Sequence, residues 1–345
     1  MDKNKIIIRD GYPDDFESIR SLFKDVWGYQ RPKKYDEWRW FSAEKKKCRI
    51  SLAWDGSYLV GAYMAGPVLI TLGEEIVQGA HAMDVMVRAE YTGQLIFTRL
   101  GEHCKTRAQE EGFQVFYAFP NPLSFPGFVG RLKWGHIGDI GHWVRPIVPS
   151  KYERIPTWAG PLINGVTNIL PKGPNVKADL KICELDMLEV GELLAKNSSL
   201  SGPISIYRDL DRIKWRYSKS TNYDYQCFGA FCSGKIEAIG IWGMRNESWG
   251  NVQDYRAHLT ELIGSNLIAF QAIIRMVIES AFKREAMLLE TATNVAPFEK
   301  LLRRAGFLKH RRMPMVLTLL DSKLKNSGIE TYLKWAVFGG DIDTF

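Results

Sequence analysis

Paired cysteines are missing from this 345-residue sequence. Its five cysteines are scattered along the chain: Cys48, Cys104, Cys183, Cys227 and Cys232. Because none belongs to a CxxC pair, the pattern excludes a zinc clamp or a redox site of that type. We therefore expect a protein of the reduced cytoplasm that holds no metal.

Long hydrophobic runs are also missing. The most apolar stretch, residues 266–282, is interrupted by Gln271, Arg275 and Glu279, whereas a membrane-spanning helix needs about 20 mostly apolar residues. Arg275 and Glu279 are one helical turn apart, which predicts an ion pair on the exposed edge of a mostly buried helix. The N-terminus has a run of only three isoleucines, too short for a signal peptide. The sequence predicts no membrane insertion.

What the chain does have is an excess of positive charge. It contains 46 Lys and Arg against 39 Asp and Glu, which gives a net charge of +7. This balance favours anionic partners such as phosphates, nucleic acid or acidic lipid. At roughly 100–200 residues per domain, the length predicts two units, or one fold used twice.

Proline marks a connector between two halves. Six of the fifteen prolines fall between Pro146 and Pro174, together with three glycines, in a stretch where neither a long helix nor a central strand would persist. We predict a first unit over residues 1–145, a connector over residues 146–177 and a second unit over residues 178–345.

Landmarks of the first half recur in the second half in the same order. Trp38-Arg39-Trp40 is matched by Trp215-Arg216-Tyr217, and Asn121 by Asn294, at an offset near 175. Each half begins with a strand-like segment followed by apolar residues at helical spacing. We infer a tandem duplication, with each unit an α/β (α+β) mixed sheet that has helices on both faces.

The segment richest in chemistry is residues 80–108. A predicted strand over residues 80–87 leads into a turn at Gly93 and then into a helix. A helix N-terminus presents free N–H groups and the positive end of a dipole to an anion. An ordinary strand-to-helix turn is the alternative for this segment taken alone.

This segment resembles the GNAT acyltransferase superfamily, whose strand runs into a diphosphate-binding glycine loop and a helix. Residues 91–97 keep the frame of the loop, although Thr92 and Leu95 replace an Arg and a second Gly. Residues 116–121 resemble the family's fifth strand and its Pro-Asn turn. The resemblance spans roughly residues 5–145 and implies two tandem GNAT-like units, with the cofactor in the first unit only.

The resemblance implies an acyl-CoA co-substrate, either acetyl-CoA or hydroxybutanoyl-CoA. The residues that it assigns to cofactor binding are Val85, Met86, Val87, Gly93, Gln94, Leu95, Ile96, Phe119 and Asn121. The first three lie where a backbone N–H would hold the thioester carbonyl.

An attacking amine must lose a proton and the departing thiolate must be stabilised. Asp84 is our first candidate for the base and His81 the second; alternation places them on opposite faces of the strand unless a bulge intervenes. Asp84 as a structural carboxylate satisfied by an arginine, and His81 as a satisfied sheet histidine, remain the alternatives. The family's tyrosine acid is absent because Arg131 stands there, which leaves water or Ser124 as the proton donor.

The combination resembles bacterial N-acyltransferases that act on nucleotide-linked amino-dideoxy sugars, which implies such a sugar, dTDP-linked, as the acceptor. Its candidate contacts are Trp38, Arg39, Trp215, Arg216 and Tyr217; packing beneath each sheet is their alternative role. We expect a cytoplasmic monomer or homodimer that does not bind nucleic acid.

Two other functions stay open. An aminoacyl-tRNA-dependent transferase would need a basic surface, for which Lys45–Lys47, Arg303, Arg304, Arg311 and Arg312 are available. A non-catalytic binding module would fit the departures from the glycine loop.

Overall fold

The computed structural model describes residues 6–42, 48–151, 165, 167, 170–171, 180–196, 203–217, 223–245 and 255–342. These residues form two compact units. Unit 1 contains residues 1–138 and 314–332, and unit 2 contains residues 139–248, 253–313 and 333–345. Within the described ranges, no helix combines the length and hydropathy needed to cross a bilayer.

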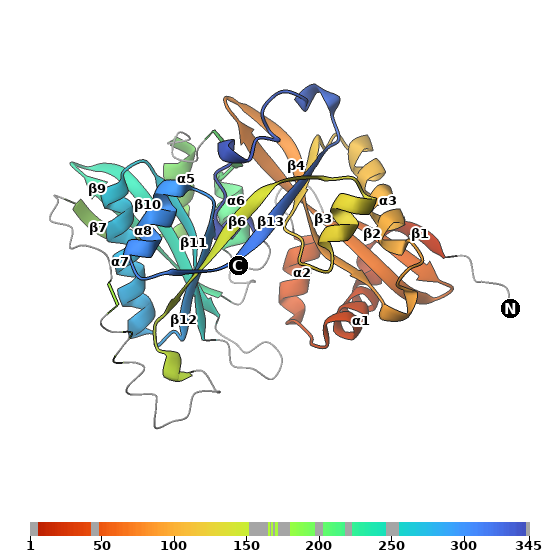
Figure 1. Cartoon of the computed structure of the whole chain (residues 1–345), viewed down its shortest axis with the longest axis horizontal. Helices are drawn as coiled ribbons and strands as arrows, with labels where there is room; N and C mark the ends of the chain where they lie inside the picture. The colour runs from red at the N-terminus through yellow and green to blue at the C-terminus, as the bar shows by residue number, and fades with distance from the viewer. Residues whose placement is uncertain are drawn as a thin grey trace. The chain divides into compact units, whose positions relative to one another are not determined.

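Unit 1 is a mixed sheet with helices on both faces (Figure 1). Its strands are β1 (Ile7–Asp10), β2 (Arg49–Asp55), β3 (Tyr58–Leu72), β4 (Glu75–Val87), β5 (Val115–Ala118) and the C-terminal part of β13 (Leu308–Leu319), adjacent in that order. Its helices are α1 (Phe16–Trp27), α2 (Lys33–Phe41) and α3 (Ile96–Glu110). Neighbouring strands are antiparallel except β4 and β5, which are parallel.

Each face of this sheet has its own core. Ala80 and Ala82 of β4 pack with Leu100 of α3, whereas Met83 and Met86 pack in the cluster that contains α1. The alternating small and large apolar residues of β4 therefore place helices on both faces.

Unit 2 repeats this plan. Its strands are β6 (Gly135–Pro146), β12 (Leu288–Thr293), β11 (Arg256–Gly264), β10 (Lys235–Arg245), β9 (Tyr223–Cys232) and β7 (Leu180–Leu185), adjacent in that order, and β8 is Ile204–Ile206. Its helices are α5 (Met187–Lys196), α6 (Leu210–Arg216), α7 (Leu267–Lys283) and α8 (Ala296–Arg304). Here β11 and β12 are the parallel pair.

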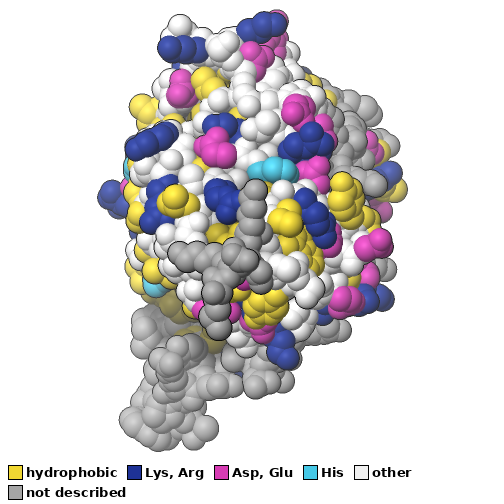
Figure 2. All heavy atoms as spheres, turned by 90° about the vertical axis from the view of Figure 1, so that its right-hand side faces the viewer, with side chains coloured by type: hydrophobic (Ala, Val, Ile, Leu, Met, Phe, Trp, Pro, Cys, Tyr) yellow, Lys and Arg dark blue, Asp and Glu magenta, His cyan; other side chains and the backbone are white. Residues whose placement is uncertain are grey.

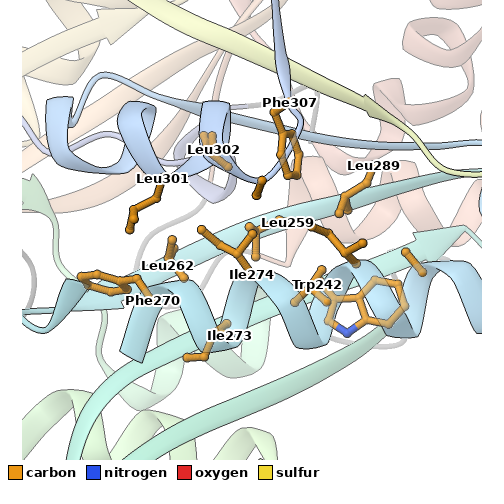
Figure 3. Packing of buried hydrophobic residues seen from close by; sticks show 14 of the residues in the cluster. Trp242, Leu259, Leu262, Phe270, Ile273, Ile274, Leu289, Leu301, Leu302 and Phe307 are labelled. Carbon is orange, nitrogen blue, oxygen red and sulfur yellow. The ribbon is translucent and has the colours of Figure 1, made fainter. Parts of the chain in front are cut away.

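The core of unit 2 lies between its sheet and the helices α7 and α8. Trp242 and Leu259 of the sheet face Ile274 of α7, and Leu302 of α8 closes the cluster (Figure 3). Burial of such side chains stabilises the fold by about 1.5–3 kcal/mol each.

Helix α7 is the apolar helix that the sequence predicts. Arg275 Nε lies 3.1 Å from Glu279 Oε1, so the predicted ion pair is confirmed. The helix begins at Leu267, directly after the predicted start of the apolar stretch at residue 266. Asn266 caps it, because its side chain accepts hydrogen bonds from the N–H groups of the first turn.

The two units are not contiguous along the chain, unlike the division that we predicted at residues 145 and 178. Pairing explains the difference: β13 supplies unit 1 with the strand next to β5, and β6 supplies unit 2 with the strand next to β12. Most of the predicted connector lies outside the described residues. Pro171 is described, and its carbonyl accepts a hydrogen bond of 2.9 Å from Arg145.

The C-terminal segment of the chain completes unit 2. Phe338 bridges Thr293 at the end of β12, and Asp341 accepts two hydrogen bonds, of 2.8 and 2.9 Å, from Arg208. Arg208 also donates to Glu261 of β11 over 3.0 Å. All three charged side chains are buried, so they depend on one another for the hydrogen bonds that water would otherwise supply.

Asp341→Ala should therefore destabilise the protein by about 3–5 kcal/mol, because it leaves part of a buried ion network unpaired. Chemical denaturation monitored by tryptophan fluorescence measures this change. Asp224→Ala is the control in the same unit, since Asp224 is half exposed and pairs with Arg284 at the surface; we expect about 0–1 kcal/mol there. Equal effects of the two substitutions would contradict the structural role of the buried network.

Candidate functional site

A β-bulge interrupts β4 beside the parallel pair of unit 1. Ala62 of β3 is opposite Met86 and Met64 is opposite Met83, so β4 has one extra residue between these positions. Asp84 lies at the bulge with a φ of 45°, a conformation uncommon for residues other than glycine. The bulge re-aims the Asp84 side chain toward α2.

The bulge also brings His81 and Asp84 to one face of the sheet. His81 lies between Ala80 and Ala82, which face α3, so alternation directs its ring to the opposite face. Asp84 contacts Arg39 and Trp40 of α2, on that same face. We expected His81 and Asp84 on opposite faces unless a bulge intervened. The bulge is present, and the two side chains lie on one face.

Asp84 is held by two arginines and a tryptophan. Arg31 donates from both terminal nitrogens over 3.2 and 3.1 Å, Arg39 Nε donates over 2.7 Å, and Trp40 Nε1 donates over 2.9 Å. Burial alone would raise the pKa of the Asp84 carboxyl, but Arg31 and Arg39 hold that pKa well below its usual range. A carboxylate so stabilised is a weak proton acceptor, which argues against the base role that we ranked first and favours the structural alternative.

His81 lies where the pairing of β4 with β5 ends. The parallel register has three residue pairs and stops at His81 and Tyr117, although β4 continues to Val87. The His81 ring stacks on Tyr117, with centroids 4.7 Å apart, and its edge meets Phe119 at 5.6 Å. Beyond this point the β4 edge that faces β5 has no strand partner among the described residues, so its backbone groups can bind a ligand.

The N-terminus of α3 is open. Gly93 and Leu95 have positive φ values of 88° and 60°, and they turn the chain so that α3 begins at Ile96. No described side chain caps the helix, and a Cβ added at Gly93 would meet nothing within 4 Å. The first N–H groups of an α-helix have no intrahelical partner, so this terminus can bind an anion.

Leu95 takes a left-handed conformation at the position where the family loop has its second glycine. Such a conformation costs a non-glycine residue roughly 1–2 kcal/mol. The Leu95 side chain is 56% exposed, which leaves the turn itself unobstructed. Leu95 in place of glycine therefore raises the conformational energy of the turn without changing the course of its backbone.

Unit 2 lacks this opening. Its corresponding helix α7 follows β11 after only two residues and is capped by the Asn266 side chain. The N–H groups that would bind an anion already have a partner there. That a cofactor binds in the first unit only stays a prediction, which this contrast favours.

Asn121 and Ser124 form the turn after β5. The Asn121 side chain accepts hydrogen bonds from the N–H groups of Leu123 and Ser124 over 3.0 and 2.9 Å. The Ser124 hydroxyl donates to the Asn121 carbonyl over 3.3 Å. Asn121 therefore shapes the Pro-Asn turn, and Ser124 lies half-buried beside it.

The residues that we predicted as acceptor contacts are mostly in the interior. Trp38, Arg39, Arg216 and Tyr217 are buried, and Trp215 is half-buried. Tyr217 donates to Glu261 over 2.6 Å. Their packing role is thus the better interpretation, and both arginines are hydrogen-bonded inside the protein, Arg39 to Asp84 and Arg216 to the Gly340 carbonyl.

Sequence reasoning missed Arg31 and Arg208. Arg208 lies 177 residues after Arg31, and Glu261 lies 177 residues after Asp84. Arg31 binds Asp84 of β4, and Arg208 binds Glu261 of β11. The repeat was the signal that would have found this pair, had the offset been applied to charged residues as well as to aromatic ones.

Comparisons with known proteins agree with this geometry. Residues 8–137 match the family model described as an acetyltransferase (GNAT) domain. A search of the curated proteins finds no match to the chain.

Solved structures resemble nearly the whole chain. A tandem GNAT protein from the clavulanic acid biosynthesis pathway has a TM-score of 0.61 at 13% identity, with 92% of this chain and 99% of that chain covered. N-myristoyltransferase from Saccharomyces cerevisiae, with bound myristoyl-CoA, has a TM-score of 0.63 at 12% identity, with 92% and 83% covered. A GCN5-related glucosamine N-acetyltransferase region of a fungal multi-domain enzyme has a TM-score of 0.63 at 12% identity, with 91% and 38% covered.

At these identities the structural likeness shows the fold alone, whereas the sequence match assigns the first part of the chain. The chain therefore has a GNAT fold, and its residues 8–137 match the family model of an acetyltransferase (GNAT) domain.

Proposed function

We propose that the protein is an acyl-CoA-dependent N-acyltransferase whose co-substrate binds unit 1. The observation that carries this proposal is the uncapped N-terminus of α3, because the equivalent helix of unit 2 is capped by Asn266. A diphosphate is the anionic part of coenzyme A, and a helix N-terminus binds such a group through N–H donors and the helix dipole.

The remaining parts of the co-substrate would bind where β4 and β5 stop pairing, which we call the splay. The backbone of Val85–Val87 lies on β4 beyond the last paired residue and would bind the amide groups and the thioester carbonyl. Phe119 and Asn121 follow β5 on the opposite side. Gly93, Gln94, Leu95 and Ile96 would hold the diphosphate. Acetyl-CoA and hydroxybutanoyl-CoA remain the two proposed donors.

His81 is the proposed base. It lies at the last residue pair before the splay, beside the position that the thioester would take. An imidazole accepts a proton near neutral pH. The reaction forms the amide bond as the amine attacks the thioester carbon, breaks the C–S bond and leaves a thiolate. Ser124 or water would return a proton to that thiolate.

The proposed acceptor is the amino group of a nucleotide-linked amino-dideoxy sugar. One protein of similar fold is a glucosamine N-acetyltransferase region, which supports an amino sugar as the acceptor. A screen of dTDP-linked and other nucleotide amino sugars against several acyl-CoA donors, with released thiol as the readout, tests this choice. Transfer only to amines without a nucleotide would refute the acceptor and leave the acyltransferase proposal intact.

Gly93→Asp should raise the Kd for coenzyme A at least about tenfold, because it places a carboxylate at the proposed anion site and a side chain at a φ of 88°. Isothermal titration calorimetry measures this affinity. Gly73→Asp is the matched control, since Gly73 also has a positive φ of 64° and open space around its Cβ position. Coenzyme A binding that the Gly93 variant retains at wild-type strength would refute the site.

His81→Gln should lower kcat by about 100-fold or more and leave coenzyme A affinity unchanged, because it removes the proposed proton acceptor. Steady-state kinetics of both proteins, with released thiol as the readout, measure this change. An unchanged kcat would exclude His81 as the base.

Asp84→Asn should act on stability first. Removing the charge takes from the buried Arg31 and Arg39 the carboxylate that they share, while Arg31 stays paired with Asp36. Breaking such a buried pair costs about 3–5 kcal/mol. Since the folded-state pKa of Asp84 is depressed, its contribution is complete above the ordinary carboxylate pKa of about 3.9 and disappears as the pH falls toward the lower folded value. The gap between wild type and variant in thermal unfolding should therefore shrink on acidification. A gap that is constant with pH would contradict the ion-pair role.

A further inference from the structure

One buried polar group of unit 1 has no hydrogen-bond partner. Tyr63 of β3 is 0% exposed, and among the described residues nothing forms a hydrogen bond with its hydroxyl. Buried hydroxyls are normally paired, because an unpaired one loses its hydrogen bonds to water on folding. On the face of the molecule shown in Figure 2, by contrast, acidic and basic side chains are interspersed at the surface, where water can satisfy them. The Tyr63 hydroxyl is therefore ready for a partner that the described residues do not supply.

Tyr63 stands opposite the bulge of β4. The pairs on either side of it are regular, whereas Asp84 and Val85 of β4 together oppose this one residue. The backbone of Val85–Val87, which would hold the thioester carbonyl, begins at the same point of β4. Tyr63 is thus one strand away from the place where that carbonyl would bind.

The Tyr63 side chain lies on the face of the sheet that α3 covers. It packs in the cluster that contains Leu100 of α3, whereas its neighbours in β3, Ala62 and Met64, pack in the cluster with α1. The ring of His81, the proposed base, is directed to the face opposite α3. The Tyr63 hydroxyl and the His81 imidazole therefore belong to opposite faces of the sheet, and a thioester bound at the edge of β4 would lie between them.

The Tyr63 ring extends across β4 toward the splay. Its centroid is 6.3 Å from the ring of Phe97, in the first turn of α3, and 6.3 Å from the ring of Phe128, in the helical turn Gly127–Arg131 that follows β5. Since β4 lies between β3 and β5, a ring of β3 that contacts Phe128 must cover β4. Neighbouring strands are about 4.8 Å apart, a distance that a tyrosine side chain spans.

The surroundings of this hydroxyl keep it neutral. Burial raises the pKa of Tyr63 well above its usual value of about 10, so the hydroxyl retains its proton at neutral pH and can donate it in a hydrogen bond. The adjacent rings of Phe97 and Phe128 are apolar, and a hydrogen bond in such an environment is stronger than in water. A fixed, neutral donor in a dry position is the kind of group that stabilises an oxyanion.

We propose that Tyr63 is a catalytic residue, which donates a hydrogen bond to the thioester carbonyl oxygen together with a backbone N–H of Val85–Val87. The proposal rests on the proposed acyl transfer and adds a second donor to it. Since the hydroxyl is closed to solvent, it would meet the carbonyl only once the co-substrate has entered the splay.

The proposed donor acts while charge is on the oxygen. As the amine forms its bond to the thioester carbon, one electron pair of the C=O bond moves onto the oxygen, and His81 accepts the proton of the amine. The Tyr63 O–H stabilises the oxyanion and keeps its own proton. The electron pair then returns, the C–S bond breaks and the thiolate leaves. Tyr63 therefore lowers the barrier without changing its protonation state.

Tyr63→Phe removes the hydroxyl and leaves the ring. The kcat should fall about 100-fold, the usual effect of removing one oxyanion donor. The Kd for coenzyme A, which has no thioester carbonyl, should not change. The melting temperature should not fall, because the lost hydroxyl has no partner among the described residues. Steady-state kinetics, isothermal titration calorimetry and thermal unfolding measure the three quantities.

Infrared difference spectroscopy gives a readout that a packing role would not move. The probe is the donor that the wild type turns over, acetyl-CoA or hydroxybutanoyl-CoA, labelled with a heavy isotope at the carbonyl carbon. A hydrogen bond from Tyr63 lowers the stretching frequency of the bound carbonyl, and this band should shift back toward its free value in Tyr63→Phe.

Thr260→Val is the matched control in unit 2. It also removes a buried hydroxyl, but Thr260 Oγ1 donates to the Ile241 carbonyl over 3.0 Å. This variant should lower the melting temperature and leave kcat unchanged.

Two kinds of failure are distinguishable. A wild type that turns over, with a Tyr63→Phe variant of equal kcat or an unshifted carbonyl band, would overturn the role of Tyr63 and leave the acyltransferase intact. A lower melting temperature of Tyr63→Phe with unchanged kcat would make the residue structural and overturn the role as well. A wild type that binds no coenzyme A would refute the proposed function itself, and the oxyanion role with it.

Discussion

Each unit depends on a buried arginine that binds a carboxylate of its sheet, on β4 in unit 1 and on β11 in unit 2. In unit 1, Arg31 joins Asp84 at the bulge to the segment that precedes α2. In unit 2, Arg208 joins Glu261 to the C-terminal segment through Asp341. Because a buried charge is stable only when paired, these contacts determine how the first helices pack on the sheet and where β4 and β11 leave their regular path.

The carboxylates that these arginines bind have pKa values shifted in opposite directions in the two units. Two arginines keep the pKa of Asp84 low, whereas burial and the neighbouring Asp341 carboxylate raise the pKa of Glu261 above its usual value despite Arg208. Asp84 is therefore a fixed anion at the edge of the proposed active site, and it is best understood as a residue that shapes the splay next to His81. The proposed proton acceptor, His81, and the structural carboxylate, Asp84, are then different side chains on one face of the sheet.

The duplication has left one open helix terminus and one closed terminus. A longer connection with Gly93 and Leu95 at positive φ opens α3, while Asn266 closes α7. In unit 2 the C-terminal residues contact the sheet, and Phe338 bridges Thr293 at the end of β12.

The sequence by itself determined the α/β class, the duplication, helix α7 with its Arg275–Glu279 pair, and the position of the open turn at Gly93, because these depend on local periodicity and on residues close together in the chain. Only the tertiary structure decided that Asp84 pairs with Arg31, that the aromatic residues Trp38 and Tyr217 are buried, and that β6 and β13 make the units non-contiguous. These features arise from contacts between residues far apart in the chain, and a one-residue bulge, which no periodicity reveals, sets the direction of the decisive carboxylate.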